Sequence, residues 1–253
     1  MFLRILTLFL CFAVVLSAPQ QIERKILGGE ENALGEIPYV VSITIFTGLH
    51  ICSGAIISDW WTITAAHCIF GRGPNTVVVR PGRIRLDVNS MEDRQGSVLI
   101  THPNYVAEIL ENDIGLIQVS RAFVFNVNIQ PIALSDSFVG GGIAAAVSGW
   151  GTLTPGGINH NFLLTLQTST LSNADCQSRH TSQNAALIRD DTICTNNLVG
   201  EGFCNRAFGS PLVSDSKLIA IASWNVPCAL GYPDVYSRIF TSLDWIRTVT
   251  GIN

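Results

Sequence analysis

The chain has 253 residues, a formal net charge of −4 and only 13% charged residues. It contains no basic run that would hold phosphate, so we expect no nucleic-acid partner. Six of its seven cysteines follow the leader segment, an even number that suits an oxidising compartment. They form no CxxC pair and no His/Cys cluster with metal spacing, so we expect neither a metal nor another cofactor.

The first residues have the pattern of a secretory signal. A cation at Arg4 precedes an apolar run over residues 5–16, and the small residues Ser17 and Ala18 follow. Cleavage after either small residue fits. We assign residues 1–17 to the signal peptide, 18–25 to a short propeptide and 26–253 to one domain. No later stretch reaches about 18 consecutive apolar residues, so we expect a secreted, extracellular protein with no membrane association.

Short runs rich in Val, Ile and Thr recur along the rest of the chain. Gly, Pro, Asn and Asp separate them, a pattern that predicts an all-β sandwich or barrel. The predicted strands cover residues 39–46, 76–80, 83–88, 97–101, 114–119, 143–150, 161–171, 211–215 and 218–224.

Two segments have helical patterns instead. The first is "SNADCQSRH", residues 172–180, with Ser172 or Asn173 as the N-cap. The second is "TSLDWIRTV", residues 241–249, with Thr241 or Ser242 as the N-cap. Its apolar residues share one face of a helix with a period of 3.6 residues, namely Leu243, Ile246 and Val249.

Two polar residues in apolar surroundings indicate acid–base chemistry. His67 lies in "TITAAHC" and Asp113 lies in "ENDIGLI". A carboxylate in an apolar strand is costly unless a donor satisfies it. A carboxylate that orients an imidazole meets this need and makes the histidine a general base for a nearby hydroxyl.

Five ordered motifs carry a resemblance to the chymotrypsin/trypsin-like serine endopeptidase family. They are "ILGGEEN" after Lys25, "HICSGAIISDWWTITAAHC", "NDIGLI", "SGWG" and "ASWNVPCALGYPDVYSRI". The resemblance runs from Ile26 to the end of the chain. It implies two antiparallel six-stranded β-barrels, roughly residues 26–135 and 136–240, with a cleft between them and a C-terminal α-helix.

The resemblance also implies a cross-linking and activation scheme. The implied disulfides are Cys52–Cys68, Cys176–Cys194 and Cys204–Cys228, each worth about 3 kcal/mol by loop entropy. The implied activation is a zymogen cut between Lys25 and Ile26, after which the new ammonium pairs with a buried aspartate of the second barrel.

The stretch "CNRAFGSPL" departs from the family's pattern of Cys, one variable residue and GDSGGPL. Phe208 stands at the place of the nucleophilic serine, and a phenyl ring has no oxygen to attack a carbonyl. Arg206 replaces an oxyanion-hole glycine, and Ala207 replaces the aspartate that would receive the Ile26 ammonium. We therefore expect that cleavage after Lys25 does not drive the usual switch.

Two interpretations follow for the polar residues that remain. His67, Asp113 and Ser223, which matches a family serine bonded to the aspartate, are vestigial and form a satisfied buried network. Alternatively Ser210 acts as a displaced nucleophile. Because it lies two residues past the expected position, we favour the first interpretation.

The implied specificity pocket also departs from the family's pattern. Gly202 stands at its base, while Asn225 and Asp234 replace glycines of its walls. Three alternatives stay open: Asp234 meets a basic side chain, Arg206 pairs with Asp234, or the loop is disordered.

The sequence thus favours a non-catalytic, monomeric serine protease homologue, which acts by binding proteins or peptides. It would serve as an inhibitor decoy, a substrate competitor or a regulator of an active protease. The alternative is an active extracellular serine endopeptidase. About seven residues separate the signal from Lys25. They leave no room for the clip module of family members that act in arthropod defence cascades.

Overall fold

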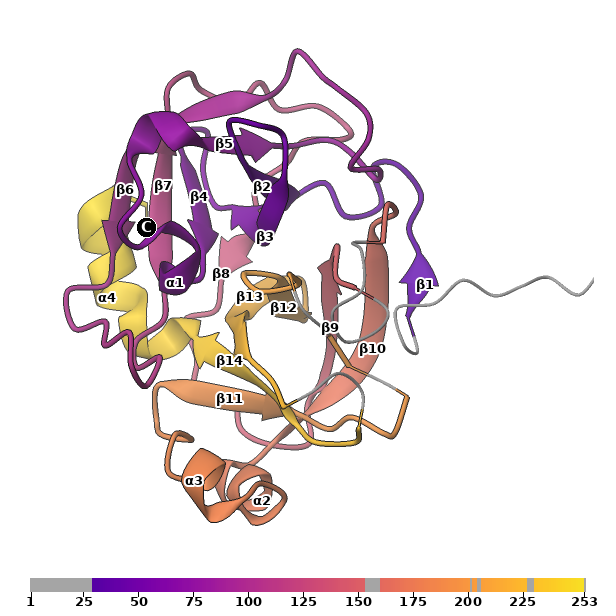
Figure 1. The fold of residues 1–253 in the computed structure, drawn as a ribbon, viewed down its shortest axis with the longest axis vertical. Helices are drawn as coiled ribbons and strands as arrows, with labels where there is room; N and C mark the ends of the chain where they lie inside the picture. Colours follow the sequence, from indigo (N-terminus) through magenta and orange to yellow (C-terminus); the bar gives the residue numbers. More distant parts are fainter. Residues whose placement is uncertain (1–28, 153–159, 201, 204–205, 227–229, 253) are drawn as a thin grey trace, which may run out of the picture.

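The computed structural model describes residues 29–152, 160–200, 202–203, 206–226 and 230–252 (Figure 1). Several predicted features therefore lie outside the described residues. They are the signal peptide, the propeptide, the Lys25–Ile26 junction and the Cys204–Cys228 disulfide. No helix among the described residues is long and apolar enough to cross a membrane.

The first half of the chain closes into a barrel with the strand order β2-β3-β4-β7-β6-β5. Its strands are β2 (Val40–Ile45), β3 (His50–Ile56), β4 (Trp61–Thr64), β5 (Val77–Arg80), β6 (Arg94–Thr101) and β7 (Gly115–Val119). Branched apolar side chains fill its centre, because alternate residues of each strand point inward. Two short helical segments, α1 (Ala66–Ile69) and η1 (Pro74–Thr76), connect β4 to β5.

The second half forms another closed barrel. Its strands are β9 (Ala144–Gly149), β10 (Leu164–Leu171), β11 (Thr192–Thr195), β12 (Pro211–Ser214), β13 (Lys217–Trp224) and β14 (Asp234–Arg238). The order β10-β11-β14-β13-β12-β9 closes because β9 also pairs with β10. Two further short strands, β1 (Glu30–Glu31) and β8 (Ala133–Leu134), pair with β10 and β13. The predicted fold of two six-stranded barrels is therefore confirmed.

The helices follow the predicted positions with one correction. Helix α2 (Asn173–Ser178) starts after Ser172, whose hydroxyl accepts from the Asp175 amide, and α3 (Ser182–Ala185) follows it. The predicted N-cap of the last helix is wrong. Helix α4 (Ile239–Thr250) has Arg238 as its N-cap, because β14 leads into the helix without a loop. Its buried residues pack on the first barrel, beside which Figure 1 shows it in yellow.

One predicted strand is absent, and six observed strands lie outside the predicted runs. Residues 83–88 form a connection in which only Arg85 makes a bridge, to Phe162. The polar residues of this segment make ion pairs instead of strand contacts. The buried Arg83 contacts Asp93, which also pairs with Arg80. The strands outside the predicted runs are the two short strands β1 and β8 and the barrel strands β3, β4, β11 and β14. Each of these four barrel strands contains buried polar residues, which weaken a pattern based on apolar alternation.

Two of the three implied disulfides lie within the described residues. Cys52–Cys68 joins β3 to α1, and Cys176–Cys194 joins α2 to β11. The first holds the turn that carries His67 against the first barrel.

Candidate active site

His67, Asp113 and Ser223 meet between the two barrels. His67 lies on α1, Asp113 lies just before β7, and Ser223 lies on β13. The Asp113 carboxylate is fully buried and has three donors. The His67 amide donates to Oδ1 at 2.8 Å, and His67 Nδ1 and the Ser223 hydroxyl donate to Oδ2 at 2.7 and 2.6 Å.

This geometry orients the imidazole as a general base needs. With Nδ1–H donated to Asp113, the lone pair of Nε2 faces away from the carboxylate. The sequence-predicted residues are thus brought together. Their arrangement could take a proton from a hydroxyl if one were within hydrogen-bond reach.

The side chain that adjoins the imidazole is the phenyl ring of Phe208. The ring centroids of His67 and Phe208 are 5.1 Å apart, with an interplanar angle of 80°. Phe208 is half-buried and packs against the hydrophobic cores of both barrels. Phe208, which the sequence pattern predicts at the family's nucleophile position, therefore contributes apolar packing between the barrels and offers no oxygen.

The backbone before Phe208 is anchored by a buried histidine. His50 Nε2 lies 3.1 Å from the Arg206 carbonyl oxygen, and His50 Nδ1 lies 2.8 Å from the Ser42 hydroxyl. Burial lowers the pKa of His50 to about 4. The neutral ring therefore donates through Nε2 and accepts through Nδ1. Ala207 lies in the apolar core of the second barrel, so no carboxylate takes part in this anchor.

Ser210 lies at a close crossing of the two barrels. Gly209 has φ of +78°, and a Cβ atom there would lie 2.1 Å from the Ser53 carbonyl oxygen, so only glycine fits. The Ser210 hydroxyl is buried against Gly149 and has no hydrogen-bond partner among the described residues. It makes no hydrogen bond with His67.

The predicted pocket residues surround Asp234 in the second barrel. Its Oδ2 accepts from the Phe203 amide at 2.8 Å, and burial raises the pKa of this carboxyl to about 8. Gly202 has φ of +132° and leaves no space for a Cβ atom, which would lie 2.9 Å from Asp234 Oδ2. The Asn225 amide donates to the Phe203 carbonyl oxygen at 2.5 Å.

Two features of this region correct or extend the sequence analysis. Arg206 is exposed and makes no ion pair with Asp234, so the alternative in which these two residues pair is wrong. Phe203 escaped the sequence analysis, although it is 2% exposed and contacts Asp234 through its amide. The available signal was a large aromatic residue beside the glycine at the implied pocket base.

The arrangement does not fit a metal. Among the described ranges, the one group of metal-ligating residues with suitable spacing is Cys52, His67 and Cys68. Both sulfur atoms are used in the disulfide, so thiolate ligands are absent from this group.

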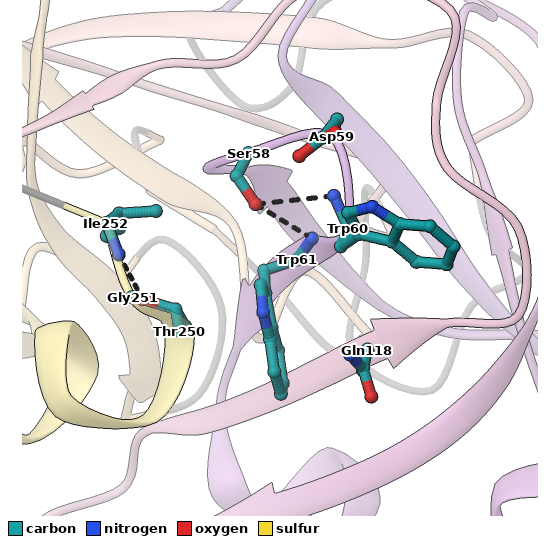
Figure 2. Close-up of a pocket in the computed structure, with 8 residues that line it drawn as sticks. All are labelled: Ser58, Asp59, Trp60, Trp61, Gln118, Thr250, Gly251 and Ile252. Atoms are coloured by element: carbon teal, nitrogen blue, oxygen red, sulfur yellow. Dashed lines mark hydrogen bonds between the residues drawn. The ribbon is translucent and has the colours of Figure 1, made fainter.

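An open pocket of about 390 Å³ lies elsewhere, between the end of α4 and the turn before β4 (Figure 2). Its lining includes Ser58, whose hydroxyl accepts from the amides of Trp60 and Trp61. None of the predicted site residues lines this pocket.

Two six-stranded barrels, with a histidine held by a buried aspartate between them, have the architecture of the trypsin-like fold. A family model described as Trypsin matches residues 26–246. The chain is 36% identical to trypsin II-P29 of Gallus gallus over 228 residues, which cover 88% of each chain. It is 33% identical to anionic trypsin of Canis lupus familiaris, with 94% of each chain covered. It is 34% identical to chymotrypsin-2 of Vespa crabro, with 88% of this chain and 98% of that protein covered. The chain therefore belongs to the trypsin family.

Proposed function

We propose that the protein is a secreted, non-catalytic member of the trypsin family that acts by binding proteins or peptides. The observation that carries the proposal is the phenyl ring of Phe208 beside the His67 imidazole, 5.1 Å from it. A serine peptidase needs a hydroxyl there to form the acyl-enzyme. Removal of the nucleophile from such an enzyme lowers turnover by about 10⁶-fold.

The anchoring of the loop before Phe208 supports the same proposal. A neutral His50 holds the Arg206 carbonyl oxygen, and Ala207 is packed among apolar side chains. An inserted N-terminal ammonium would find no carboxylate at position 207 and would remain unpaired. Cleavage after Lys25 would therefore leave the loop as it is.

The position of Ser210 does not favour a displaced nucleophile. Ser210 is only 1% exposed, and its hydroxyl lies against Gly149 of β9. General-base catalysis requires hydrogen-bond reach of the imidazole, about 2.6–3.2 Å. The His67–Asp113–Ser223 network then serves stability, because loss of one partner would leave buried groups unpaired.

The partners in this proposal are protease inhibitors, active proteases or peptides, and the protein acts as a secreted monomer. It would compete with active relatives for their ligands or regulate them directly. Affinity capture from the native secretion would identify which of these classes is retained.

A fluorophosphonate probe tests the proposal on the purified, Lys25-cleaved protein. We expect no labelling of the natural chain, since no activated serine is present. We expect labelling at position 208 in the triple variant Arg206→Gly, Ala207→Asp, Phe208→Ser, because His67 and Asp113 retain their geometry. The triple variant with Asp113→Asn is the matched control. Stoichiometric labelling of any serine in the natural chain would contradict the proposal.

A further inference from the structure

The pocket of about 390 Å³ on the first barrel has the size of a ligand site (Figure 2). Its lining consists of the turn residues 58–61, Gln118 of β7 and residues 250–252 at and after the end of α4. We call it the Trp60 pocket. Its volume falls in the range of roughly 300–1,000 Å³ that small-ligand sites have. No residue of the His67 network lines it, so that network does not explain its presence.

Hydrogen bonds fix the backbone of the turn that forms one wall of this pocket. The Ser58 hydroxyl accepts from the amides of Trp60 and Trp61 at 3.3 and 3.2 Å. The carbonyl oxygens of Asp59 and Trp60 accept from amides of residues 119–123 at 2.7 and 3.0 Å. A turn held in this way presents its side chains in one arrangement, which lowers the entropy cost of binding a ligand.

Two side chains of the turn remain without a charged partner. Asp59 is exposed and forms no ion pair within the described part of the chain. The neighbouring Trp60 is 42% exposed. A carboxylate next to an aromatic ring is a combination that suits a guanidinium group, because this planar cation pairs with carboxylates and stacks on aromatic rings.

The end of α4 adds negative potential to the pocket. Gly251, with φ of +72°, terminates the helix, and its amide donates to the Arg247 carbonyl oxygen at 2.8 Å. The last carbonyl groups of a helix lack partners within it, and the helix dipole places a partial negative charge there. The lining contains no Lys, Arg or His, and Arg247 itself does not belong to it. The pocket is therefore complementary in charge to a cation.

Part of the lining is apolar. Trp61 is 8% exposed, and Ile252 is half-buried. In Figure 2 the Trp61 ring extends from the turn, between residues 250–252 on one side and Gln118 on the other. Apolar groups near a carboxylate suit the methylene stem of a long charged side chain, which packs on them while its charged head stays near water.

We infer that the Trp60 pocket binds an arginine side chain of a partner protein. The guanidinium group pairs with Asp59 and stacks on Trp60, and the stem packs against Trp61 and Ile252. This site would hold a partner by a surface other than the one around His67. It does not depend on the residue at position 208, so it goes beyond the proposed function and would be present in an active peptidase as well.

The test is an NMR titration of the protein with N-acetyl-arginine amide, followed by the indole N–H signals of its five tryptophans. We expect a saturable shift of the Trp60 and Trp61 signals, assigned with Trp60→Ala, and a Kd on the order of millimolar. Trp224, which follows Ser223 of the His67 network, is the internal control and should not shift. N-acetyl-citrulline amide has nearly the same shape without the charge, and it should bind about fivefold or more weakly.

Two variants locate the cation. Asp59→Asn should weaken binding of N-acetyl-arginine amide by about fivefold or more, because the carboxylate is lost. Asp244→Asn removes an exposed carboxylate of α4 outside the pocket, and it should change the affinity by less than about twofold.

Four results would overturn the inference. They are no saturable shift of the Trp60 signal, equal affinity for the arginine and citrulline compounds, unchanged affinity in Asp59→Asn, and equal losses in Asp59→Asn and Asp244→Asn. None of these measurements involves fluorophosphonate labelling. Failure of the Trp60 pocket and failure of the proposed function are therefore distinguishable.

Discussion

The surroundings of two buried aspartates, Asp113 and Asp234, differ. Asp113, beside the first barrel, accepts from the His67 amide, His67 Nδ1 and the Ser223 hydroxyl. Asp234, in the second barrel, accepts from the Phe203 amide, and burial raises its pKa to about 8. Asp113 lies in a network of polar groups, whereas the aromatic residues Phe203 and Tyr236 lie near Asp234. A buried polar group needs its hydrogen-bond partners, whereas an apolar interior needs only side chains that fill its volume.

Substitution of Asp113 should have the largest effect on stability. Asp113→Ala leaves the His67 amide and the Ser223 hydroxyl without their acceptor in a buried place. We expect a loss of about 3–5 kcal/mol in the free energy of unfolding, measured by urea denaturation. Asp136→Ala, which breaks an exposed pair with Lys217, is the control and should change it by less than about 0.5 kcal/mol. A loss below about 1 kcal/mol for Asp113→Ala would contradict the structural role of the network.

Loss of the Phe208 ring should have a smaller effect. Phe208→Ala removes contacts with both cores and with His67, and it should cost about 2 kcal/mol, because the ring is only half-buried. Phe70→Ala is a matched control, since Phe70 also has an edge contact, with Tyr105, but is 58% exposed. Equal melting temperatures of the two variants would show that Phe208 contributes no packing between the barrels.

The pH dependence of stability should report on Asp234. Its pKa is about 8 in the folded protein and near 3.8 when exposed, so the folded state holds a proton that the unfolded state releases. Stability from this group therefore falls as the pH rises from about 4 to 8. His50, with a pKa of about 4 in the folded protein, contributes stability that rises with pH from about 4 to 6.5, so it opposes the Asp234 effect only in that range.

The window from about pH 6.5 to 8 isolates the Asp234 effect. There we expect the free energy of unfolding to fall by on the order of 1 kcal/mol, and Asp234→Asn to remove this decrease. Urea denaturation at the two pH values measures both. An unchanged slope in Asp234→Asn would exclude Asp234 as its source.

The smallest predicted effect is a gain in stability at the barrel crossing. The buried Ser210 hydroxyl has no hydrogen-bond partner among the described residues, so Ser210→Ala should stabilise the protein by about 1 kcal/mol. Ser214, the last residue of β12, is a matched control. Its hydroxyl has a partner, because it donates to the Ala144 carbonyl oxygen at 2.8 Å. Ser214→Ala should instead lose about 1 kcal/mol. Destabilisation by both variants would indicate that Ser210 has a partner.

Features set by local interactions could be predicted from the sequence, whereas features set by contacts between distant segments could not. Short motifs placed His67, Asp113 and Ser223 together, and the Ser172 cap followed from local hydrogen bonding. Residues 83–88 were predicted as a strand because apolar and polar residues alternate there with the period of a strand. In the structure this segment is a connection, in which the buried Arg83 forms an ion pair with Asp93. The start of α4 was misplaced because β14 enters it directly.

The sequence by itself determined the two-barrel family and the polar network around His67, and it has a phenylalanine at position 208, where the family pattern predicts the nucleophilic serine. These conclusions depend on residue identity and order, which a motif records directly. Only the tertiary structure decided the surroundings of these residues: Phe208 packs against both cores, His50 anchors the Arg206 carbonyl oxygen, and the Phe203 amide donates to Asp234. Each of these contacts joins segments far apart in the chain, and packing between such segments leaves no periodic signal in the sequence.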